Sequence, residues 1–410
     1  MHPKLKPLAL LLCVSSSHLF AAPADWPQWR GPGRDGHSAD TGLLKTWPST
    51  GPTLLWKASG LGIGYSSVAV SNGQIFTMGD GEKKSHILAL DLDGKELWKA
   101  AVGRTGGNYE GTRGTPTVSE GLVYGLGQFG DLVCVEARTG KEKWRRSLEK
   151  DFGGAVGGWN YSESPLVDGD KLVCAPGGKG GAVVALNKAT GEEIWRSKDH
   201  TDRSEYTSIV AAKIAGAMQY VHLTDRHLVG IDADTGRVLW KTSRRGSTAV
   251  IPTPIVHGDH VYVTSGYGVG CNLFKISKSG DKLEVEEVYS RKDMVNHHGG
   301  VVKVGDHLYG YSDGKGWVCQ DFLTGKTLWR EEKLGKGSIA FADGMLYLRE
   351  EDGKGKVALI EASPEGWKEH GRFDQPFRSH QNSWAHPVVT DGRLYLRDMD
   401  VLLCYAVKKS

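Results

Sequence analysis

Thr-Gly-Arg-Val-Leu-Trp, at residues 235–240, decides the fold, because close copies of it return along the chain at residues 93–98, 139–144, 190–195 and 324–329. Successive copies are about 45 to 50 residues apart, except for one double interval between Trp240 and Trp329. That interval contains a degenerate copy at Ser279-Gly280, from which the tryptophan is missing. A fixed period of this size indicates a single supersecondary unit copied many times.

Each copy follows the same succession of short strand signals. A turn-and-strand element comes first, for example Val256-His-Gly-Asp-His-Val-Tyr262, and a strand such as Leu228–Ile231 precedes the Thr-Gly turn. Asp-Gly pairs between alternating apolar residues are strong hairpin signals. Four short strands per repeat, without helical periodicity, predict the blade of a β-propeller.

The recurring tryptophan suits a propeller because a four-stranded sheet cannot bury both of its faces alone. A large ring at a fixed position can fill the space between neighbouring blades, which buries about 200 Å² per ring. We therefore predict a docking role for six residues: Trp56, Trp98, Trp144, Trp195, Trp240 and Trp329.

The number of blades follows from the turn-and-strand elements, which begin near Val68, Val118, Val167, Val210, Val256, Val302, Ala340 and Val388. No tryptophan phrase follows the last element, and no strands precede the phrase that ends at Trp56. We expect the strand near Leu54 to complete the last blade, because this closes the ring and removes an open edge. The prediction is an all-β, eight-bladed propeller of four-stranded antiparallel blades over residues 51–410, preceded by an extended segment over residues 22–50.

The first 21 residues have the pattern of a secretory signal. A basic start is followed by the apolar run Leu8–Val14 and by a small-residue cleavage site at Ala21 or Ala22. A lipid anchor at Cys13 is not expected, because the preceding Leu12 is bulky where a lipoprotein signal needs a small residue. We therefore expect a periplasmic or secreted protein without a transmembrane segment.

The net charge and the cysteines limit which partners and which covalent cross-links can be expected. The formal net charge is only +3, and no basic stripe is present, which argues against nucleic acid as a partner. The cysteines beyond the leader stand in apolar strand patterns, so we expect mostly free, buried thiols: Cys134, Cys174, Cys271, Cys319 and Cys404.

The segment Gly230-Ile-Asp-Ala-Asp-Thr-Gly-Arg-Val-Leu-Trp240 resembles the tryptophan-docking repeat of the PQQ-enzyme family, Ala-x-Asp-x-x-Thr-Gly-x-x-x-Trp. The opening Trp26-Pro-Gln-Trp29-Arg-Gly-Pro32 is similar to the start of exported propellers of that type. The pattern is not uniform, since Glu136 and Asn187 stand at the Asp position. The resemblance implies an eight-bladed propeller, and the family includes both quinoprotein dehydrogenases and the scaffold of outer-membrane protein assembly.

Similarity to the dehydrogenases would imply pyrroloquinoline quinone and a calcium ion on the propeller axis. Those enzymes are longer and commonly carry adjacent cysteines beside the cofactor, and this chain has no Cys-Cys pair. No calcium ligand and no catalytic residue can be mapped onto it.

In a propeller, the residues just before the first strand of each blade form the mouth of the axial channel. Here these positions carry aromatic, charged and imidazole side chains: Tyr65, Tyr109–Arg113, Trp159–Glu163, Glu205, Tyr206, Thr248, His297, His298, Lys336 and His380–His386. Such convergence is typical of a ligand site. The candidates selected from this set for ligand or cofactor binding are Arg113, Tyr161, Glu163, Glu205, His297, His298, Lys336, Trp384 and His386.

Each candidate suggests a role. Arg113 could pair with a carboxylate or with quinone oxygens, and Glu163 or Glu205 could ligate a hard cation or act as a base. Of the two adjacent imidazoles, only one is expected to enter the channel, because successive strand residues point to opposite faces. Trp384 or Trp159 could stack on a planar ligand.

Three readings of the rim remain open at this point: a solvated rim whose ion pairs tie blades together, a site for a small molecule or ion, and a protein-binding face. The sequence favours a monomeric binding or scaffold propeller that presents this rim to an envelope protein or a small ligand. The alternative is a PQQ- and calcium-dependent oxidoreductase similar to alcohol dehydrogenases.

Overall fold

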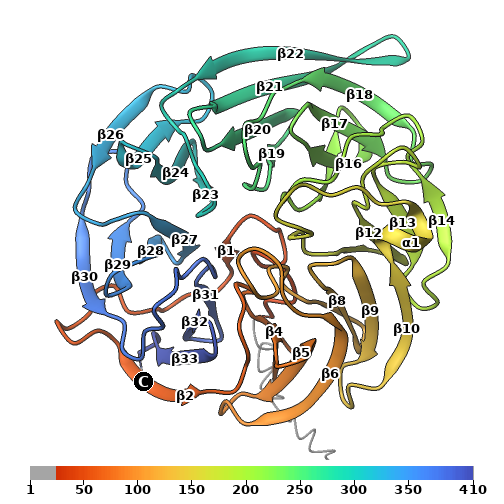
Figure 1. The fold of residues 1–410 in the computed structure, drawn as a ribbon. Helices are drawn as coiled ribbons and strands as arrows, with labels where there is room; N and C mark the ends of the chain where they lie inside the picture. Colours follow the sequence, from red (N-terminus) through yellow and green to blue (C-terminus); the bar gives the residue numbers. More distant parts are fainter. Residues whose placement is uncertain (1–24, 410) are drawn as a thin grey trace, which may run out of the picture.

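The computed structural model describes residues 25–409, so the predicted signal lies outside the described residues. These residues form eight antiparallel sheets arranged as a ring around a central axis (Figure 1). Seven sheets have four strands, and the seventh in chain order has five because β1 (His37–Ser38) pairs in parallel with β27. The predicted eight-bladed propeller is confirmed.

Each blade runs outward from a short inner strand to an outer strand. The first four blades consist of β3 (Ala69–Ser71), β4 (Gln74–Asp80), β5 (Lys84–Asp91) and β6 (Glu96–Arg104); β7 (Thr117–Ser119), β8 (Leu122–Leu126), β9 (Asp131–Glu136) and β10 (Glu142–Ser147); β11 (Leu166–Asp168), β12 (Lys171–Cys174), β13 (Val184–Asn187) and β14 (Glu193–Arg196); and β15 (Val210–Ile214), β16 (Ala217–Leu223), β17 (His227–Asp232) and β18 (Val238–Ser243).

The remaining blades follow in the same way. They consist of β19 (Ile255–His257), β20 (His260–Ser265), β21 (Gly270–Ser279) and β22 (Lys282–Arg291); β23 (Val301–Val304), β24 (His307–Ser312), β25 (Gly316–Asp321) and β26 (Thr327–Glu331); β27 (Gly337–Ala342), β28 (Met345–Glu350), β29 (Lys356–Glu361) and β30 (Glu369–Asp374); and β31 (Val388–Thr390), β32 (Arg393–Asp398), β33 (Val401–Ala406) and β2 (Thr53–Ala58). One short helix, α1 (Leu148–Phe152), follows β10. In the part of the chain that the structure describes, no helix has the length and apolar character to cross a bilayer.

The last blade is closed by the N-terminal strand, as predicted. Strand β2 pairs with β33 in antiparallel register, with Trp56 opposite Cys404. The C-terminus consequently lies beside β2 (Figure 1). The ring has no unpaired blade edge at the seam, because β2 supplies the strand that the C-terminal hairpins lack.

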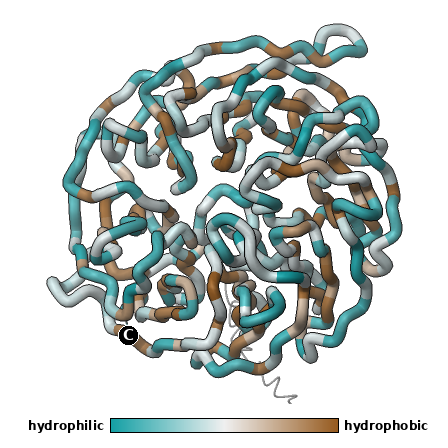
Figure 2. Tube along the Cα trace, in the orientation of Figure 1, coloured by the Kyte–Doolittle hydropathy of each residue, from teal (hydrophilic) through white to brown (hydrophobic). Residues whose placement is uncertain are grey.

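Hydrophobic residues are concentrated in the middle strands, and the outer strands are largely hydrophilic (Figure 2). In the second blade, for example, β9 is buried along its centre, whereas β10 is exposed or half-buried throughout. The core therefore consists of clusters that each span two neighbouring blades, such as the one that joins Phe76 and Met78 to Val123 and Val133.

The repeated tryptophans dock on the next blade through a common geometry. The indole Nε1 of Trp98 donates to the carbonyl of Ala137 at 2.9 Å, and Gly140 lies against the indole face, where a Cβ would come within 2.6 Å of the ring. The glycine of the Thr-Gly turn is thus required for the close approach of the neighbouring ring. Equivalent Nε1–carbonyl bonds are made by Trp56, Trp144, Trp195 and Trp329.

Trp240 departs from this geometry. Its Nε1 donates to Gln219 of its own blade at 2.6 Å, although the ring still packs in the cluster shared with the fifth blade. The next blade offers no turn carbonyl at the usual place, because β21 continues as far as Ser279 in a long hairpin with β22.

The docking position of the fifth blade is taken by a tyrosine that the sequence pattern missed. Tyr289 follows a bulge in the β21–β22 pairing, as the tryptophans do in their blades, and its hydroxyl donates to the Phe322 carbonyl at 2.9 Å. Gly325 lies against the Tyr289 ring. Tyr289 therefore contacts a carbonyl and a glycine of the next blade as the docking tryptophans do, although the hairpin is longer and the residue is different.

Candidate functional site: an aromatic cup at the axial mouth

The segment 25–38 crosses the axis of the ring and binds several blades. Trp26 exchanges two backbone hydrogen bonds with Val70 of the first blade, each of 2.8 Å, and β1 pairs with β27 of the seventh. Figure 1 shows β1 near the centre of the ring. We call this stretch the axial segment.

Two buried arginines fix the axial segment from within. Arg30 Nη2 donates to the Val301 carbonyl at 2.6 Å, and Arg34 Nη2 donates to the Ser164 carbonyl at 2.6 Å. Burial lowers the pKa of each guanidinium to about 10, which leaves both charged at neutral pH. The arginines thereby satisfy one carbonyl of the inner strand β23 and one of the loop before β11.

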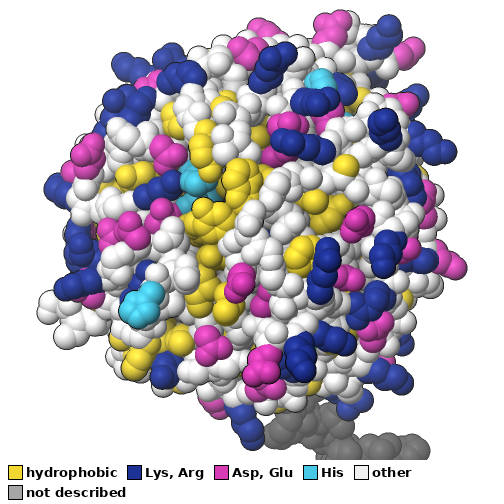
Figure 3. Space-filling model, viewed as in Figure 1, with side chains coloured by type: hydrophobic (Ala, Val, Ile, Leu, Met, Phe, Trp, Pro, Cys, Tyr) yellow, Lys and Arg dark blue, Asp and Glu magenta, His cyan; other side chains and the backbone are white. Residues whose placement is uncertain are grey.

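A cavity of about 200 Å³ opens at the mouth of the axis, and we call it the cup. The loops before the first strands of every blade except the seventh contribute to it, together with Trp29 of the axial segment and the turn between β20 and β21. Its lining residues are Trp29, Tyr65, Tyr109, Arg113, Trp159, Ser162, Ser164, Tyr206, Ser208, Ala249, Ile251, Thr253, Tyr267, His297, His298, Trp384 and His386. Hydrophobic side chains gather at this point on the surface, with histidines beside them (Figure 3).

Trp384 is the centre of the aromatic wall. Its ring centroid lies 4.6 Å from that of Tyr65, 5.5 Å from that of Tyr109 and 5.4 Å from that of His298. Trp159 and Tyr206 form a second pair with centroids 5.9 Å apart. Aromatic faces arranged around a small volume favour a ligand with a flat apolar part.

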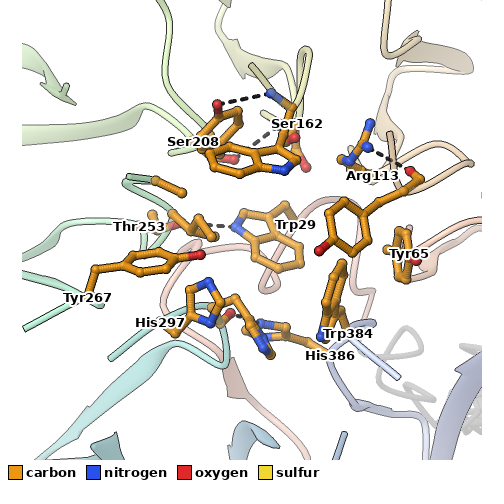
Figure 4. Close-up of a pocket in the computed structure, with 17 residues that line it drawn as sticks. Trp29, Tyr65, Arg113, Ser162, Ser208, Thr253, Tyr267, His297, Trp384 and His386 are labelled. Atoms are coloured by element: carbon orange, nitrogen blue, oxygen red, sulfur yellow. Dashed lines mark hydrogen bonds between the residues drawn. The ribbon is translucent and has the colours of Figure 1, made fainter. Parts of the chain in front are cut away.

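Trp29 lies at the centre of the cup (Figure 4), where its indole Nε1 donates to Thr253 Oγ1 at 3.0 Å. Its ring also contacts His386, at a centroid distance of 4.6 Å. The axial segment thus supplies the inner end of the cup, and the cavity is bounded there instead of continuing along the axis.

A belt of hydroxyl groups joins the blades below the rings. The backbone N–H groups of Ser67, Thr115 and Ser164 donate to the side-chain oxygens of Thr115, Ser164 and Ser208 respectively, at 2.9 to 3.1 Å. Each bond links one blade to the next. The belt holds the loops of the first four blades at fixed positions around the cup.

Both adjacent histidines line the cup, contrary to the expectation that only one would enter. Their rings lie 4.8 Å apart. The expectation rested on strand alternation, but His297 and His298 precede β23 in a loop that ends in Gly299-Gly300, so alternation does not apply.

The environments of these histidines are different. Burial, together with the charges of His298 and Lys336, lowers the pKa of His297 to about 3, so this imidazole is neutral at physiological pH. Its Nδ1 lies 2.7 Å from Lys336 Nζ, which also pairs with Asp313. His298 forms an ion pair with Glu351. Burial acts to raise the pKa of Glu351, but the hydrogen bond and the charge of His298 outweigh it, so this pKa lies below its usual value.

His386 is buried at the inner end of the cup. Its Nε2 lies 3.0 Å from the His298 carbonyl oxygen, and burial together with the charge of Arg30 lowers its pKa to about 3. A neutral imidazole in this place can donate or accept a hydrogen bond without adding charge.

Arg113 is the one arginine or lysine among the lining residues of the cup. Its Nη2 donates to the carbonyls of Asn108 and Tyr109, both at 2.6 Å, while Nη1 is buried without a hydrogen-bond partner. Burial lowers its pKa, although the nearby Tyr65 hydroxyl opposes this effect.

The structure thus brings Arg113, His297, His298, Trp384 and His386 together in the cup and places Lys336 directly behind His297. The other three candidates lie outside the lining. Tyr161 donates to the Pro176 carbonyl within the core, Glu163 accepts from the Ala175 amide at 2.6 Å, and Glu205 pairs with Arg203.

Seven lining residues were not among the rim positions named from the sequence: Trp29, Ser164, Ser208, Ala249, Ile251, Thr253 and Tyr267. Trp29 comes from the axial segment, which lies outside the repeat register, and Tyr267 comes from a turn between two strands instead of a loop before a blade. Ser208 is a small residue at a loop end. The register of the loop positions could have indicated Ser208, but only tertiary contacts place Trp29 and Tyr267.

The cup does not fit a calcium-bound quinone. A hard cation needs carboxylate or carbonyl oxygens, and the lining contains no aspartate or glutamate. Across residues 25–409, no group of three or more His, Cys, Asp and Glu side chains is arranged to hold a metal ion.

Comparison with solved structures places the chain among propellers of this architecture. BamB from Moraxella catarrhalis matches with a TM-score of 0.58 and 16% identity, covering 87% of this chain and 98% of that one. A quinohemoprotein alcohol dehydrogenase from Pseudomonas putida HK5 matches with a TM-score of 0.54 and 13% identity, covering 94% and 81%. At these identities the likeness shows the fold alone.

The curated sequences that are similar to this chain also include both assembly factors and quinone-dependent dehydrogenases. Outer membrane protein assembly factor BamB of Burkholderia pseudomallei is 29% identical over 245 residues, which are 57% of this chain and 59% of that protein. The 1-butanol dehydrogenase (quinone) of Thauera butanivorans is 24% identical over 191 residues, 42% of this chain and 30% of the enzyme. The chain matches about half the length, or less, of these relatives.

A family model described as outer membrane protein assembly factor BamB matches residues 83–319, which is more than half of the chain. The matched region runs from the β5 strand of the first blade to the β25 strand of the sixth. The chain therefore belongs to this BamB-type family of PQQ-like propellers.

Proposed function

We propose that this protein is a binding module of the cell envelope, without chemistry of its own, and that its working part is the cup. The observation that carries the proposal is a cavity walled by aromatic rings, closed at its inner end by Trp29 and free of carboxylates. The ligand is a molecule, or the end of a partner, that presents a flat apolar ring.

The arrangement supports binding better than catalysis. The candidate bases are committed to structural contacts, since Glu163 and Glu205 each accept backbone or arginine hydrogen bonds outside the lining. His297 and His386 are neutral at physiological pH, with pKa values lowered to about 3 mainly by burial. Within residues 25–409, the hydrogen bonds of these two imidazoles run to Lys336 and to the His298 carbonyl, and not to a hydroxyl or thiol that they could activate.

An envelope location is part of the same proposal. The basic and apolar leader pattern at residues 1–21 supports export, and the curated BamB relatives carry the name of an outer-membrane assembly factor. An assembly role would use the propeller as a scaffold, with the cup receiving a ring-bearing side chain of a partner.

The test uses N-phenyl-1-naphthylamine, a neutral aromatic probe whose fluorescence rises in apolar surroundings. We expect the full-length protein to bind it, and we expect Trp384→Ala to weaken binding at least about tenfold, because Trp384 contacts the rings on both sides of it. Phe377→Ala is the matched control, because Phe377 is an exposed ring in the same loop outside the lining. Equal binding by wild type and Trp384→Ala would contradict the proposal.

A second measurement distinguishes the oxidoreductase alternative from the binding proposal. The protein is incubated with pyrroloquinoline quinone and calcium chloride and assayed for dye-linked oxidation of short alcohols. We expect no calcium-dependent activity, because the lining lacks carboxylate ligands. Calcium-dependent turnover would replace the binding proposal with an enzymatic one.

A further inference from the structure

A second hollow adjoins the cup between the fourth and fifth blades, with a volume of about 410 Å³. We call it the side groove. Its lining includes Arg244, Arg245, Tyr267, Asn272, Glu287 and Lys292. Tyr267 lines both the side groove and the cup, so the two spaces meet at this residue.

The side groove carries an excess of positive charge. Arg244 is buried, and its guanidinium donates to Ser265 Oγ, to the Gly270 carbonyl at 2.9 Å and to Asn272 Oδ1 at 3.2 Å. None of these acceptors is a carboxylate. The charge of Arg244 is therefore oriented by neutral groups and not neutralised by them.

Two further cations stand at the edge of the side groove. Within residues 25–409, neither Arg245 nor Lys292 forms an ion pair with an acidic side chain, and Lys292 Nζ donates only to the Gly268 carbonyl. Glu287 is the single carboxylate in the lining, and it accepts from Asn272 Nδ2 at 3.2 Å. Three cations thus face one carboxylate, an imbalance that attracts an anion.

Tyr267 is held in an unusual backbone conformation between the two spaces. It lies in the turn from β20 to β21 with a φ of 53°, a value that a residue with a bulky side chain rarely adopts. Its ring meets the edge of His297 at a centroid distance of 4.7 Å, yet it is 45% exposed. The strained turn keeps a half-exposed ring at the boundary of the cup, where a ligand can lie across it.

We propose that the side groove is an anion subsite of the cup, and that the ligand is a small amphipathic molecule whose ring sits in the cup while its sulfonate, phosphate or carboxylate group reaches past Tyr267 to Arg245 and Lys292. The inference rests on the proposed function, since it assigns a charged part to the ligand of the same cup. It defines the ligand class as a flat aromatic ring system that bears one acidic group.

The experiment compares two probes with the same ring system. 8-Anilinonaphthalene-1-sulfonate differs from N-phenyl-1-naphthylamine by its sulfonate alone, so the ratio of their dissociation constants isolates the contribution of the anion. We expect the sulfonate to bind about fivefold or more tightly in low salt, and we expect this preference to shrink as ionic strength rises.

The double variant Arg245→Gln/Lys292→Gln removes the charges at the edge of the side groove. We expect it to lose the preference for the sulfonate while it binds the neutral probe as the wild type does. Arg138→Gln is the control, because Arg138 is an exposed cation in the turn between β9 and β10 and takes part in no ion pair among residues 25–409. Thermal unfolding of each variant checks that the fold is intact.

The possible failures are distinguishable. If neither probe binds in a manner that depends on Trp384, the proposed function itself is wrong. If both probes bind equally, or if the double variant retains the preference for the sulfonate, the anion subsite is wrong while the proposed binding function of the cup is unaffected. A preference that disappears with Arg113→Gln instead would place the anion inside the cup and would also overturn the subsite.

Discussion

At the scale of single residues, the docking ring is the feature that makes the blades fit one another. Trp98 needs both a carbonyl from the next blade for its N–H and a glycine to lie against its face. Tyr289 meets the same two requirements with Phe322 and Gly325. The position selects a large ring with a polar tip and not tryptophan as such.

Glu163 shows how a residue that suggests catalysis can be part of the framework. It is buried, accepts a hydrogen bond from the Ala175 amide, and leaves its second oxygen without a partner. Burial raises its pKa to about 8, against the lowering effects of that hydrogen bond and of Arg34. The carboxyl group is therefore protonated in the folded protein at neutral pH.

This gives a pH-dependent prediction for Glu163→Gln. Because the folded pKa is above the unfolded one, the wild-type acid contributes its full stability below about pH 4.5 and loses it as the pH rises to about 8. The amide does not ionise, so we expect similar stability of both proteins at pH 4.5 and a more stable variant at pH 8, by an amount on the order of 2–4 kcal/mol.

Urea unfolding at the two pH values measures this difference. A variant that is less stable than wild type at pH 8, and increasingly so as the pH rises, would mean that Glu163 is ionised and held by Arg34.

At the scale of elements, the axial segment has a larger effect on the site than any single blade. It pairs with the first and seventh blades through Trp26 and β1, and it supplies Trp29 to the cup. A propeller ring alone would leave an open channel on its axis. The segment turns one end of that channel into a closed cavity.

We expect Arg30→Met/Arg34→Met to detach the axial segment, because both guanidinium groups satisfy buried carbonyls. The cost to the free energy of unfolding should be on the order of 3–5 kcal/mol. Hydrogen exchange should accelerate at the amides of Trp26 and Phe341, which donate to Val70 and Gly36.

Arg138→Met provides the baseline, because a surface substitution of this kind changes stability by no more than about 0.5 kcal/mol. Unchanged amide protection in the double variant would show that strand pairing alone holds the axial segment.

The elements also show where sequence periodicity is a reliable guide. Turn pairs and alternating apolar residues predicted the eight blades, because each signal is local to one hairpin. The closing strand β2 was predicted because the phrase at Trp56 lacks preceding strands and the last element lacks a following phrase. The longer β21–β22 hairpin displaced the docking residue from the expected phrase at Ser279-Gly280 to Tyr289. The spacing between turn and bulge is set by hairpin length, which the repeat motif does not specify.

At the scale of the whole molecule, the ring is closed by β2 and crossed by the axial segment, so its blades support one another around the circle. The five cysteines of the described residues are free and buried in the middle strands of five different blades: Cys134, Cys174, Cys271, Cys319 and Cys404. Burial raises the pKa of Cys134, Cys319 and Cys404 to about 12, so the reactive thiolate is scarce as well as inaccessible.

We expect these thiols to resist a disulfide reagent such as Ellman's in the native protein and to become reactive together when the ring opens. Mass spectrometry of partly labelled samples checks this prediction, because cooperative opening gives molecules labelled at all five positions or at none. Single labelling at one cysteine would show that its blade opens independently of the rest.

The sequence by itself determined the architecture of this protein: eight blades, the docking of most of them on the next through tryptophan, and closure by the N-terminal strand. These properties follow from local hairpin signals and from a ring repeated at a constant spacing, which act within one blade or between neighbours. It also indicated the loops that surround the axis.

Only the tertiary structure decided what those loops form. The cup depends on side chains from seven blades, on Trp29 from outside the repeat and on the turn at Tyr267, which are far apart in the chain and have no common spacing. It also decided that Glu163 and Glu205 lie outside the cup, because burial and partners depend on packing that periodicity does not encode.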